Sequence, residues 1–416
     1  MMSPRRVALG RWRGLCLGAL PLLLAACGTA VSATPPSAGR QLAIFSSLPL
    51  QGPQAAASQA IVNGEKLALA QTHGHVGRFG VSYYSLDDSD PSTQLWSAGL
   101  AAANAKVASQ NNSTIAFLGD YDSGATAVSL PLINDGGILQ ISPASSYVGL
   151  TVSQFAGQDE PSRFYPTGVR TFGRNVPNDL LQGEAQVALM RRLGIHSLYV
   201  IDDLDAFDAS LAQIVASDAQ AAGITVVASD SLDMSASDYS GEVKKVGSSG
   251  AGAVFYAGQA TTGAATLWHQ LYAADGQLRL LGSSAFASGT FIASLGDSAV
   301  NTLFTTPALA PSQYPPAAQR FFAAYRRAYG YPAPADALYG YDAMQDALIS
   351  IFHAGDQGDV RADVVAQYFR LRDRNSVLGH YSIQPSGDTT LSYYGVDRVV
   401  NGAPSFYLKL NLPPVS

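Results

Sequence analysis

Cysteine is nearly absent from this sequence, which contains only Cys16 and Cys27 among its 416 residues. Two cysteines cannot build the disulfide framework that stabilises many small secreted domains, nor a four-cysteine metal site. Stability must therefore come from packing. Hydrophobic residues make up 47% of the chain and charged residues only 13%, and this length and composition favour two well-packed domains or lobes.

Clusters of basic residues are missing beyond the first 13 positions, and 31 acidic residues outnumber 25 basic ones. A nucleic-acid partner would require a basic stripe, so we expect none. Catalytic signatures are missing as well: there is no G-x-S-x-G elbow, no H-E-x-x-H pair and no P-loop. The one close histidine pair, His73 and His75, indicates a surface loop rather than a metal site. We therefore expect neither an enzyme nor a bound cofactor or metal.

The apolar run at the N-terminus, Leu15 to Ala26, is too short to span a bilayer. Four arginines precede it, which is typical of a secretory signal peptide. The run ends in "LAACG", which resembles the lipobox of bacterial lipoproteins and implies that Cys27 becomes the lipidated first residue of the mature protein. An ordinary signal peptide with an incidental cysteine is the alternative.

Residues 1–26 are therefore predicted to be a lipoprotein signal peptide, and residues 27–40, rich in Ser, Thr, Pro and Gly, a flexible tether. Loss of the signal peptide would leave 21 basic and 31 acidic residues, a net charge of −10. The pair Arg5-Arg6 leaves both general secretion and twin-arginine export open. We expect an extracytoplasmic protein that a lipid on Cys27 anchors to the cell membrane.

Strand and helix patterns alternate from Leu42 onward, which predicts parallel sheets covered by helices. The fold class is therefore α/β, with two doubly wound lobes. The first series has strands at 42–48, 79–88, 113–119 and 137–142, and helices at 58–71, 92–110 and 123–135, of which Pro131 is expected to kink the last. The second series has strands at 196–203, 224–232, 251–258 and 277–284, and helices at 206–223, 237–250 and 261–275. Further helices are predicted at 316–329, 335–353 and 360–372, before a strand-rich tail.

Several motifs occur in an order that resembles a known family. They are "IFSSLPLQGP", "YSLDDSD", "FLGDYDSGAT", "GILQISPASS", "YVIDDLDAFDAS" and "AVFYAGQATTGAA". Over residues 42–410 the chain resembles the type I periplasmic binding proteins, and within them the branched-chain amino-acid-binding lipoproteins of ABC importers. The resemblance implies two Rossmann-like lobes joined by a three-segment hinge, with the ligand bound in the cleft between them.

The same resemblance assigns residues 41–166 and 299–378 to lobe I, and residues 167–298 and 379–416 to lobe II. It also implies a monomer whose partners are a small-molecule ligand and the permease of an ABC importer.

The helix predicted to begin at Ser123 follows a strand of the first lobe, where its free amides face the binding crevice. Such amides suit a carboxylate or another oxygen acceptor. Ser123 adds a hydroxyl donor, and Gly124 allows a ligand to approach the backbone closely. The alternative is that Ser123 or Asp122 only caps the helix.

The next strand ends in "SPASS", Ser142 to Ser146. The resemblance implies that this loop contacts the α-amino and α-carboxylate groups of an amino acid, through the Ala144 backbone and the Ser146 hydroxyl. A surface turn closed by its own hydroxyl groups is the alternative. From the second lobe, the resemblance places Phe207, Tyr256 and Gln259 at the ligand, although Tyr256 equally fits a core position.

Departures from the family pattern leave the ligand open. Where amino-acid binders carry an acidic residue for the ammonium group, this chain has Ser283 or Ser284. Asp120 and Asp122 flank the carboxylate site and are candidate partners for a cation in the ligand. An amino acid, a short amide, a polyol or a cationic metabolite would each suit these groups. We expect a solute receptor that delivers its ligand to a permease, and a sensor of the same fold is the alternative.

Overall fold

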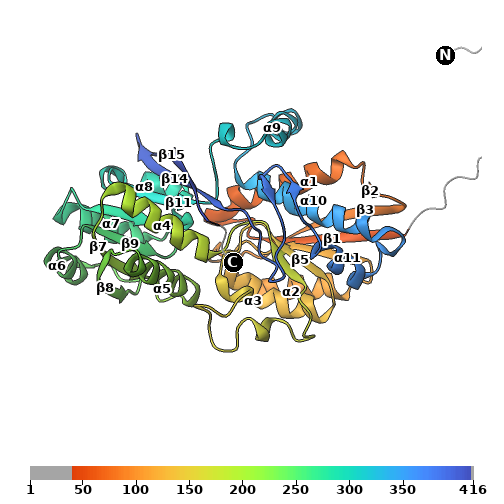
Figure 1. The fold of residues 1–416 in the computed structure, drawn as a ribbon, viewed down its shortest axis with the longest axis horizontal. Coiled ribbons are helices and arrows are strands. Elements are labelled where there is room, and N and C mark those ends of the chain that lie inside the picture. The colour runs from red at the N-terminus through yellow and green to blue at the C-terminus, as the bar shows by residue number, and fades with distance from the viewer. Residues whose placement is uncertain (1–39, 414–416) are drawn as a thin grey trace, which may run out of the picture. The chain divides into compact units, whose positions relative to one another are not determined.

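The computed structural model describes residues 40–413, so the predicted signal peptide, Cys27 and nearly all of the tether lie outside the described residues. Within this range the chain forms two mixed α/β lobes, each built on a mainly parallel sheet (Figure 1). The predicted fold class is therefore confirmed. No helix among residues 40–413 is both long and apolar enough to cross a membrane.

The sheet of lobe I has the strand order β2-β3-β1-β4-β5-β6. All neighbours are parallel except β2, which pairs antiparallel with β3. Helices α1, α10 and α11 cover one face, and α2 and α3 cover the other (Figure 1). The strands are β1 (Gln41–Leu48), β2 (His75–Val76), β3 (Phe79–Asp87), β4 (Thr114–Gly119), β5 (Leu139–Ser142) and β6 (Phe172–Arg174). The helices are α1 (Ala55–Gln71), α2 (Ala98–Gln110), α3 (Ser123–Asp135), α9 (Pro316–Tyr329), α10 (Asp336–Ala354) and α11 (Arg361–Tyr368).

The sheet of lobe II has the strand order β15-β14-β11-β10-β9-β7-β8, in which β14 and β15 are antiparallel to their neighbours. Helices α4 and α5 pack on one face, and α6 and α7 on the other. The strands are β7 (Ser197–Asp202), β8 (Thr225–Ser231), β9 (Ala253–Ala257), β10 (Arg279–Gly282), β11 (Thr302–Thr306), β14 (Tyr393–Val400) and β15 (Ala403–Asn411). The helices are α4 (Asp179–Leu193), α5 (Ala206–Ala221), α6 (Ser240–Ser249), α7 (Thr262–Ala274) and α8 (Gly289–Ser294). A two-stranded ribbon, β12 (Arg374–Asn375) and β13 (His380–Tyr381), precedes β14.

The sheets are buried on both faces, because successive side chains of a strand point to opposite sides. In β1, Ile44 packs under α1 and α10 whereas Phe45 packs under α2 and α3. In β7, Tyr199 belongs to the core beneath α6 and α7, and Val200 to the core beneath α4 and α5. Each lobe therefore has its own two-sided apolar core.

Strand pairing places the crossovers between the lobes later than we expected. Strand β6, at 172–174, lies in the sheet of lobe I, beyond the boundary predicted at residue 166. Strand β11, at 302–306, pairs with β10 and β14 in lobe II, although residues 299–378 were assigned to lobe I. Tyr381 still bonds to Asp342 of α10 in lobe I, although lobe II was expected to resume at 379.

The start of one predicted helix was wrong, and one helix was missed. The second helix begins at Ala98 rather than residue 92, because Asp90 Oδ1 accepts the amides of Ser92 and Thr93 and holds that segment in a turn. Helix α3 runs through Pro131 from Ser123 to Asp135 as predicted in extent. Helix α4 was not predicted at all.

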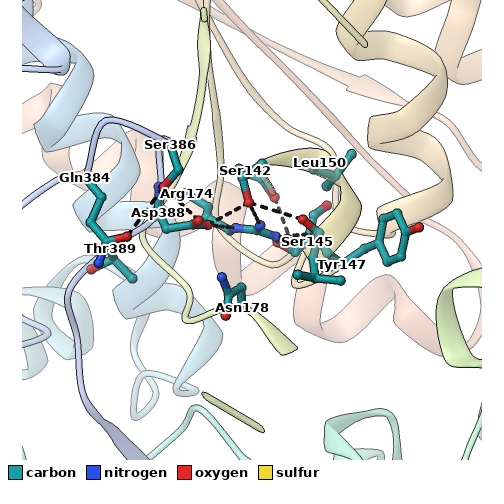
Figure 2. Close-up of polar contacts among 12 residues, drawn as sticks. Ser142, Ser145, Tyr147, Leu150, Arg174, Asn178, Gln384, Ser386, Asp388 and Thr389 are labelled. Carbon is teal, nitrogen blue, oxygen red and sulfur yellow. Dashed lines mark hydrogen bonds and ion pairs between the residues drawn. The ribbon is translucent and has the colours of Figure 1, made fainter. Parts of the chain in front are cut away.

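A buried ion pair joins two crossovers between the lobes (Figure 2). Arg174, the last residue of β6, is fully buried, and its Nε donates to Asp388 Oδ1 at 2.7 Å. Its other nitrogens donate to the carbonyls of Ser145 and Tyr147 and to the hydroxyl of Thr151. The guanidinium group is therefore fully engaged in holding the hinge segments together, since buried charges are tolerated only when paired and hydrogen-bonded.

We predict that Arg174→Met destabilises the protein strongly, because it leaves the Asp388 carboxylate buried without its partner. Breaking one side of a buried pair costs about 3–5 kcal/mol in the free energy of unfolding, measurable by urea denaturation. Arg78→Met is the control: Arg78 and Asp356 form an ion pair in which both side chains are exposed, 58% and 86%, and loss of such a surface pair costs about 1 kcal/mol or less. Equal losses for the two variants would contradict this role of Arg174.

Helix α1 carries a buried carboxyl group against the sheet. Glu65 is fully buried and accepts a hydrogen bond from the Tyr83 hydroxyl, which lies 2.7 Å from Ser46 Oγ. Burial raises the pKa of Glu65 to about 8, although the bonds to Tyr83 and Ser46 oppose the shift. The neutral, protonated form is therefore favoured in the folded protein at neutral pH.

Because the folded-state pKa of Glu65 is raised, its contribution to stability is present at low pH and is lost as the pH rises through about 8. The free energy of unfolding of wild type should therefore fall between about pH 6 and about pH 9, and that of Glu65→Gln should fall less. Urea titration at both pH values measures the two differences. Asp135→Asn, an exposed position on α3, is expected to keep the wild-type pH dependence. A wild-type profile in Glu65→Gln would show that this carboxyl group is already ionised in the folded state.

Candidate functional site

The carboxyl ends of the parallel strands in the two lobes carry loops that contact each other. The Tyr147 ring of lobe I meets the Phe207 ring of α5 edge-on, with ring centroids 4.7 Å apart. Nearby, Ser210 Oγ of α5 donates to the carbonyl of Phe155 at 2.8 Å. In open α/β sheets this is the edge at which ligands bind. We call this region the interlobe site: Trp96, residues 122–126 at the start of α3, residues 144–147, the first residue of α4, residues 203–209 at the start of α5, and Gln259.

Helix α3 begins without a side-chain cap. Asp122 occupies the N-cap position, but its side chain bonds no amide of the helix; its Oδ1 accepts instead from Gln54 Nε2 at 2.7 Å. Ser123 Oγ accepts the amide of Tyr147 at 3.2 Å, so its hydroxyl hydrogen stays available to a further acceptor. The capping alternative is therefore wrong, and Ser123 lies at the interlobe site; its contact with a ligand stays a prediction.

Gly124 is covered by aromatic rings. A Cβ atom at this position would lie 2.5 Å from Cζ2 of Trp96 and 3.2 Å from Cε2 of Phe207. The glycine thus admits two rings to the first turn of α3, where we had expected only a ligand. Trp96 was missed, because its segment was expected to be helical; the one signal in the sequence was a single tryptophan within a polar, proline-containing stretch.

The hydroxyl groups of the "SPASS" loop have two different roles. Ser142 Oγ donates to the Asp120 carbonyl at 2.8 Å and accepts the amides of Ala144 and Ser145. Ser145 Oγ also donates to the Asp120 carbonyl, at 3.1 Å. Ser142 therefore closes a turn with its own hydroxyl, as the alternative held, but both serines are buried, so the turn does not lie on the surface. It also occupies the Ala144 amide, which we had expected to contact the ligand; no hydrogen bond within residues 40–413 uses the Ala144 carbonyl.

Ser146 faces an acidic residue that we did not predict. Its carbonyl accepts the amide of Asp179 at 3.0 Å, which brings the two residues side by side. Asp179 is the first residue of α4 and is only 5% exposed. Burial raises its pKa to about 6, while the Ser146 hydroxyl and the charge of Arg174 oppose the shift. The Ser146 hydroxyl, predicted to contact a ligand, therefore lies beside a buried carboxyl group.

The residues predicted from lobe II divide between the interlobe site and the core. Phe207 is at the site, as its contacts with Tyr147 and Gly124 show. Tyr256 is fully buried against Trp268, with ring centroids 5.7 Å apart, so it is a core residue and not a ligand contact. Gln259 is exposed and donates to two carboxylates, through Nε2 to Asp208 at 3.0 Å and through its amide to Asp203 at 2.9 Å.

The acidic residues likewise fall into two groups. Asp120 is fully buried within lobe I, where its Oδ2 accepts from Ser129, so it was wrongly expected to meet a ligand. Asp122 and Asp208 lie at the interlobe site. Burial raises the pKa of Asp122 to about 7 and that of Asp208 well above its ordinary value. Ser283 Oγ accepts the amide of Ala285, so this position offers a hydroxyl and no acidic group for the ammonium of an amino acid.

Among the described residues, no group of three or more His, Cys, Asp or Glu side chains could hold a metal ion. The groups that face the interlobe site are hydroxyls, carboxylates, an amide side chain and aromatic rings. Hydrogen bonds and aromatic contacts to a small organic molecule are the chemistry that such groups provide.

Comparison with known proteins agrees with this geometry. The family model described as "Periplasmic binding protein" matches residues 46–394. The chain is 26% identical over 361 residues to the Leu/Ile/Val-binding protein homolog 3 of Brucella melitensis, a match that covers 85% of this chain and 90% of the relative.

Two solved structures share the fold. The leucine-binding protein LivK of Thermotoga maritima superposes with a TM-score of 0.74 at 21% identity, covering 89% of this chain and 99% of that protein. A solute-binding protein of an ABC transporter from Rhodopseudomonas palustris, solved with p-hydroxybenzoic acid, superposes with a TM-score of 0.74 at 14% identity, covering 90% and 98%. These relatives are solute-binding proteins and not enzymes, and the chain described here belongs to the periplasmic binding protein family.

Proposed function

We propose that this protein is a lipid-anchored, extracytoplasmic solute receptor that captures an amino acid or a related small polar molecule and delivers it to an ABC importer. The observation that carries the proposal is the interlobe site itself. Ser123 and Trp96 of lobe I and Phe207 of lobe II converge on one point at the carboxyl ends of both sheets. A solute held there would contact both lobes.

Because the solute would contact both lobes, its binding would be coupled to closure of the lobes around it. A solute that touches both surfaces stabilises the arrangement in which they are close, and the protein shifts toward it. Moving such an equilibrium from mostly open to mostly closed takes about 5 kcal/mol of differential binding. A few hydrogen bonds to charged groups, at about 1.5–3 kcal/mol each, are sufficient. The permease would then meet a closed, loaded protein, which the family's role in ABC transport supports.

The solute class follows from the relatives. The Brucella relative is named for leucine, isoleucine and valine, whereas the Rhodopseudomonas neighbour holds an aromatic acid. Both kinds of molecule are small and carry a carboxylate, which suits the uncapped first turn of α3 and the Ser123 hydroxyl. We propose that a monomer of this chain binds one such solute, beginning with amino acids, and that the screen also includes short amides, polyamines and sugars.

Ser123→Ala should weaken solute binding about tenfold, because it removes one hydrogen bond worth about 1.4 kcal/mol, without unfolding the protein. Binding can be followed through Trp96. In a Trp268→Phe background it is the sole tryptophan beyond the predicted signal peptide, so closure should change its emission. Ser248→Ala, an exposed serine of α6, is the control and should bind like its parent. Equal affinity of the Ser123→Ala variant and its parent would remove Ser123 from the site.

The lipid anchor requires its own experiment. Cys27→Ala should abolish incorporation of radiolabelled palmitate and move the protein from the detergent phase to the aqueous phase on Triton X-114 partition, because no other cysteine remains after the predicted signal peptide. Cys16→Ala is the matched control, since Cys16 lies within the predicted signal peptide. Continued labelling of the Cys27→Ala variant would exclude lipidation at this residue.

A further inference from the structure

The interlobe site contains more carboxylates than a neutral amino acid could use. One comes from lobe I, one from the first crossover and three from the start of α5 and the loop before it. The five are Asp122, Asp179, Asp203, Asp205 and Asp208. Their charges add to the effect of burial: Asp88 and then Asp205 raise the pKa of Asp122, and Asp203, Asp205 and Asp179 raise that of Asp208. Phe207, which lies between Asp205 and Asp208 in the sequence, approaches Gly124 of α3, so the two acidic segments are neighbours.

None of these carboxylates forms an ion pair with a basic side chain. Eight ion pairs exist among residues 40–413, and all of them use other acidic residues. The charge of Arg174 lowers the pKa of Asp179, but the guanidinium group of Arg174 is already bonded to Asp388, two carbonyls and Thr151. In their ionised forms these carboxylates therefore give the interlobe site negative charge that no basic side chain among residues 40–413 pairs with.

Hydrogen bonds within the protein satisfy some of these carboxylates but not all. Gln259 serves Asp203 and Asp208, and Asp205 accepts the amide of Phe207. Asp122 differs: Oδ1 accepts from Gln54, whereas Oδ2 is buried and has no donor among the described residues. A buried carboxylate oxygen without a donor is costly, and it marks the point in the acidic group at which a donor is missing.

From these contacts we infer that the solute carries a net positive charge, as a basic amino acid or a diamine, with an ammonium or guanidinium group placed between Asp122 of lobe I and the Asp205–Asp208 segment of lobe II. A zwitterionic branched-chain amino acid brings one cation and one anion, and an aromatic acid brings only an anion. Each leaves the excess negative charge unbalanced, whereas a cationic side chain supplies the hydrogen-bond donor that Asp122 Oδ2 lacks. The inference rests on the proposed function and specifies its solute.

The test compares ligands that differ in charge but hardly in shape. Isothermal titration calorimetry at pH 8 on the protein purified in detergent would measure L-arginine against L-citrulline, L-lysine against L-norleucine, and putrescine against 1,4-butanediol, with L-leucine and 4-hydroxybenzoate alongside. We expect the charged member of at least one pair to bind at least tenfold more tightly than its neutral partner and than leucine. This comparison requires no variant and is independent of folding.

Two substitutions then locate the cation. Asp122→Asn keeps an oxygen for Gln54, and Asp208→Asn keeps one for Gln259, so each removes charge with little change of shape. Each should weaken binding of the charged ligand at least tenfold and reduce the difference between the two members of the pair. Asp135→Asn, at the other end of α3 and exposed, is the matched control and should bind as wild type does. Unfolding temperatures of all variants confirm that the fold is intact.

The outcomes separate the two claims. If leucine or a neutral member of the pairs binds as tightly as every charged ligand, the cationic solute is excluded while solute capture stands. If a charged ligand binds best but both aspartate variants bind like wild type, its cation lies elsewhere and the placement between Asp122 and Asp208 is wrong. If no amino acid, amine or aromatic acid binds, the inference and the proposed solute class both fail.

Discussion

Parallel pairing within the two sheets is the constraint on which the rest of the molecule depends. Strands β1, β3, β4 and β5 run the same way, so their carboxyl ends share one edge, and β7, β9 and β10 do the same in lobe II. Parallel strands cannot be joined by tight hairpins. At this edge each strand is instead followed by a loop and the N-terminus of a helix. Polar backbone groups therefore gather where the lobes meet, and the side chains of these loops decide what is bound.

Support and contact are divided among neighbouring residues of these loops. Ser142 and Ser145 direct their hydroxyls into lobe I and bond the backbone that precedes α3. That backbone in turn places Ser123 beneath the Tyr147 amide. The three serines of this loop therefore differ in role. Ser142 and Ser145 stabilise the loop, whereas the Ser146 carbonyl accepts the amide of Asp179 at the start of α4. A loop held in this way can present donors in fixed positions, which reduces the entropy lost on binding.

The sequence predicted the alternation of elements and the bounds of α3, because local periodicity and turn residues determine these features. The roles of Ser123 and Phe207 in ligand binding stay predictions. Other features depend on contacts between distant segments. Trp96, which precedes α2, covers Gly124 in the first turn of α3, and no local pattern encodes a contact between these two segments. Helix α4 buries polar residues such as Gln182 and Gln186 beside its leucines. The sequence therefore shows no clear helical pattern of apolar residues there, and neither α4 nor the position of Asp179 at its start was predicted. Crossover positions were misplaced because they depend on strand pairing.

The carboxylates make closure of the interlobe site dependent on charge, which its hydroxyl groups alone would not do. Like charges that approach each other without a counter-ion repel, and burial adds a desolvation cost. Bringing Asp122 of lobe I toward Asp205 and Asp208 of lobe II is therefore opposed in the absence of a cation and favoured in its presence. An anionic solute would increase the same repulsion. The carboxylates that select the charge of the solute would thus also keep the empty protein from closing, so that specificity and the equilibrium between open and closed forms share one electrostatic origin.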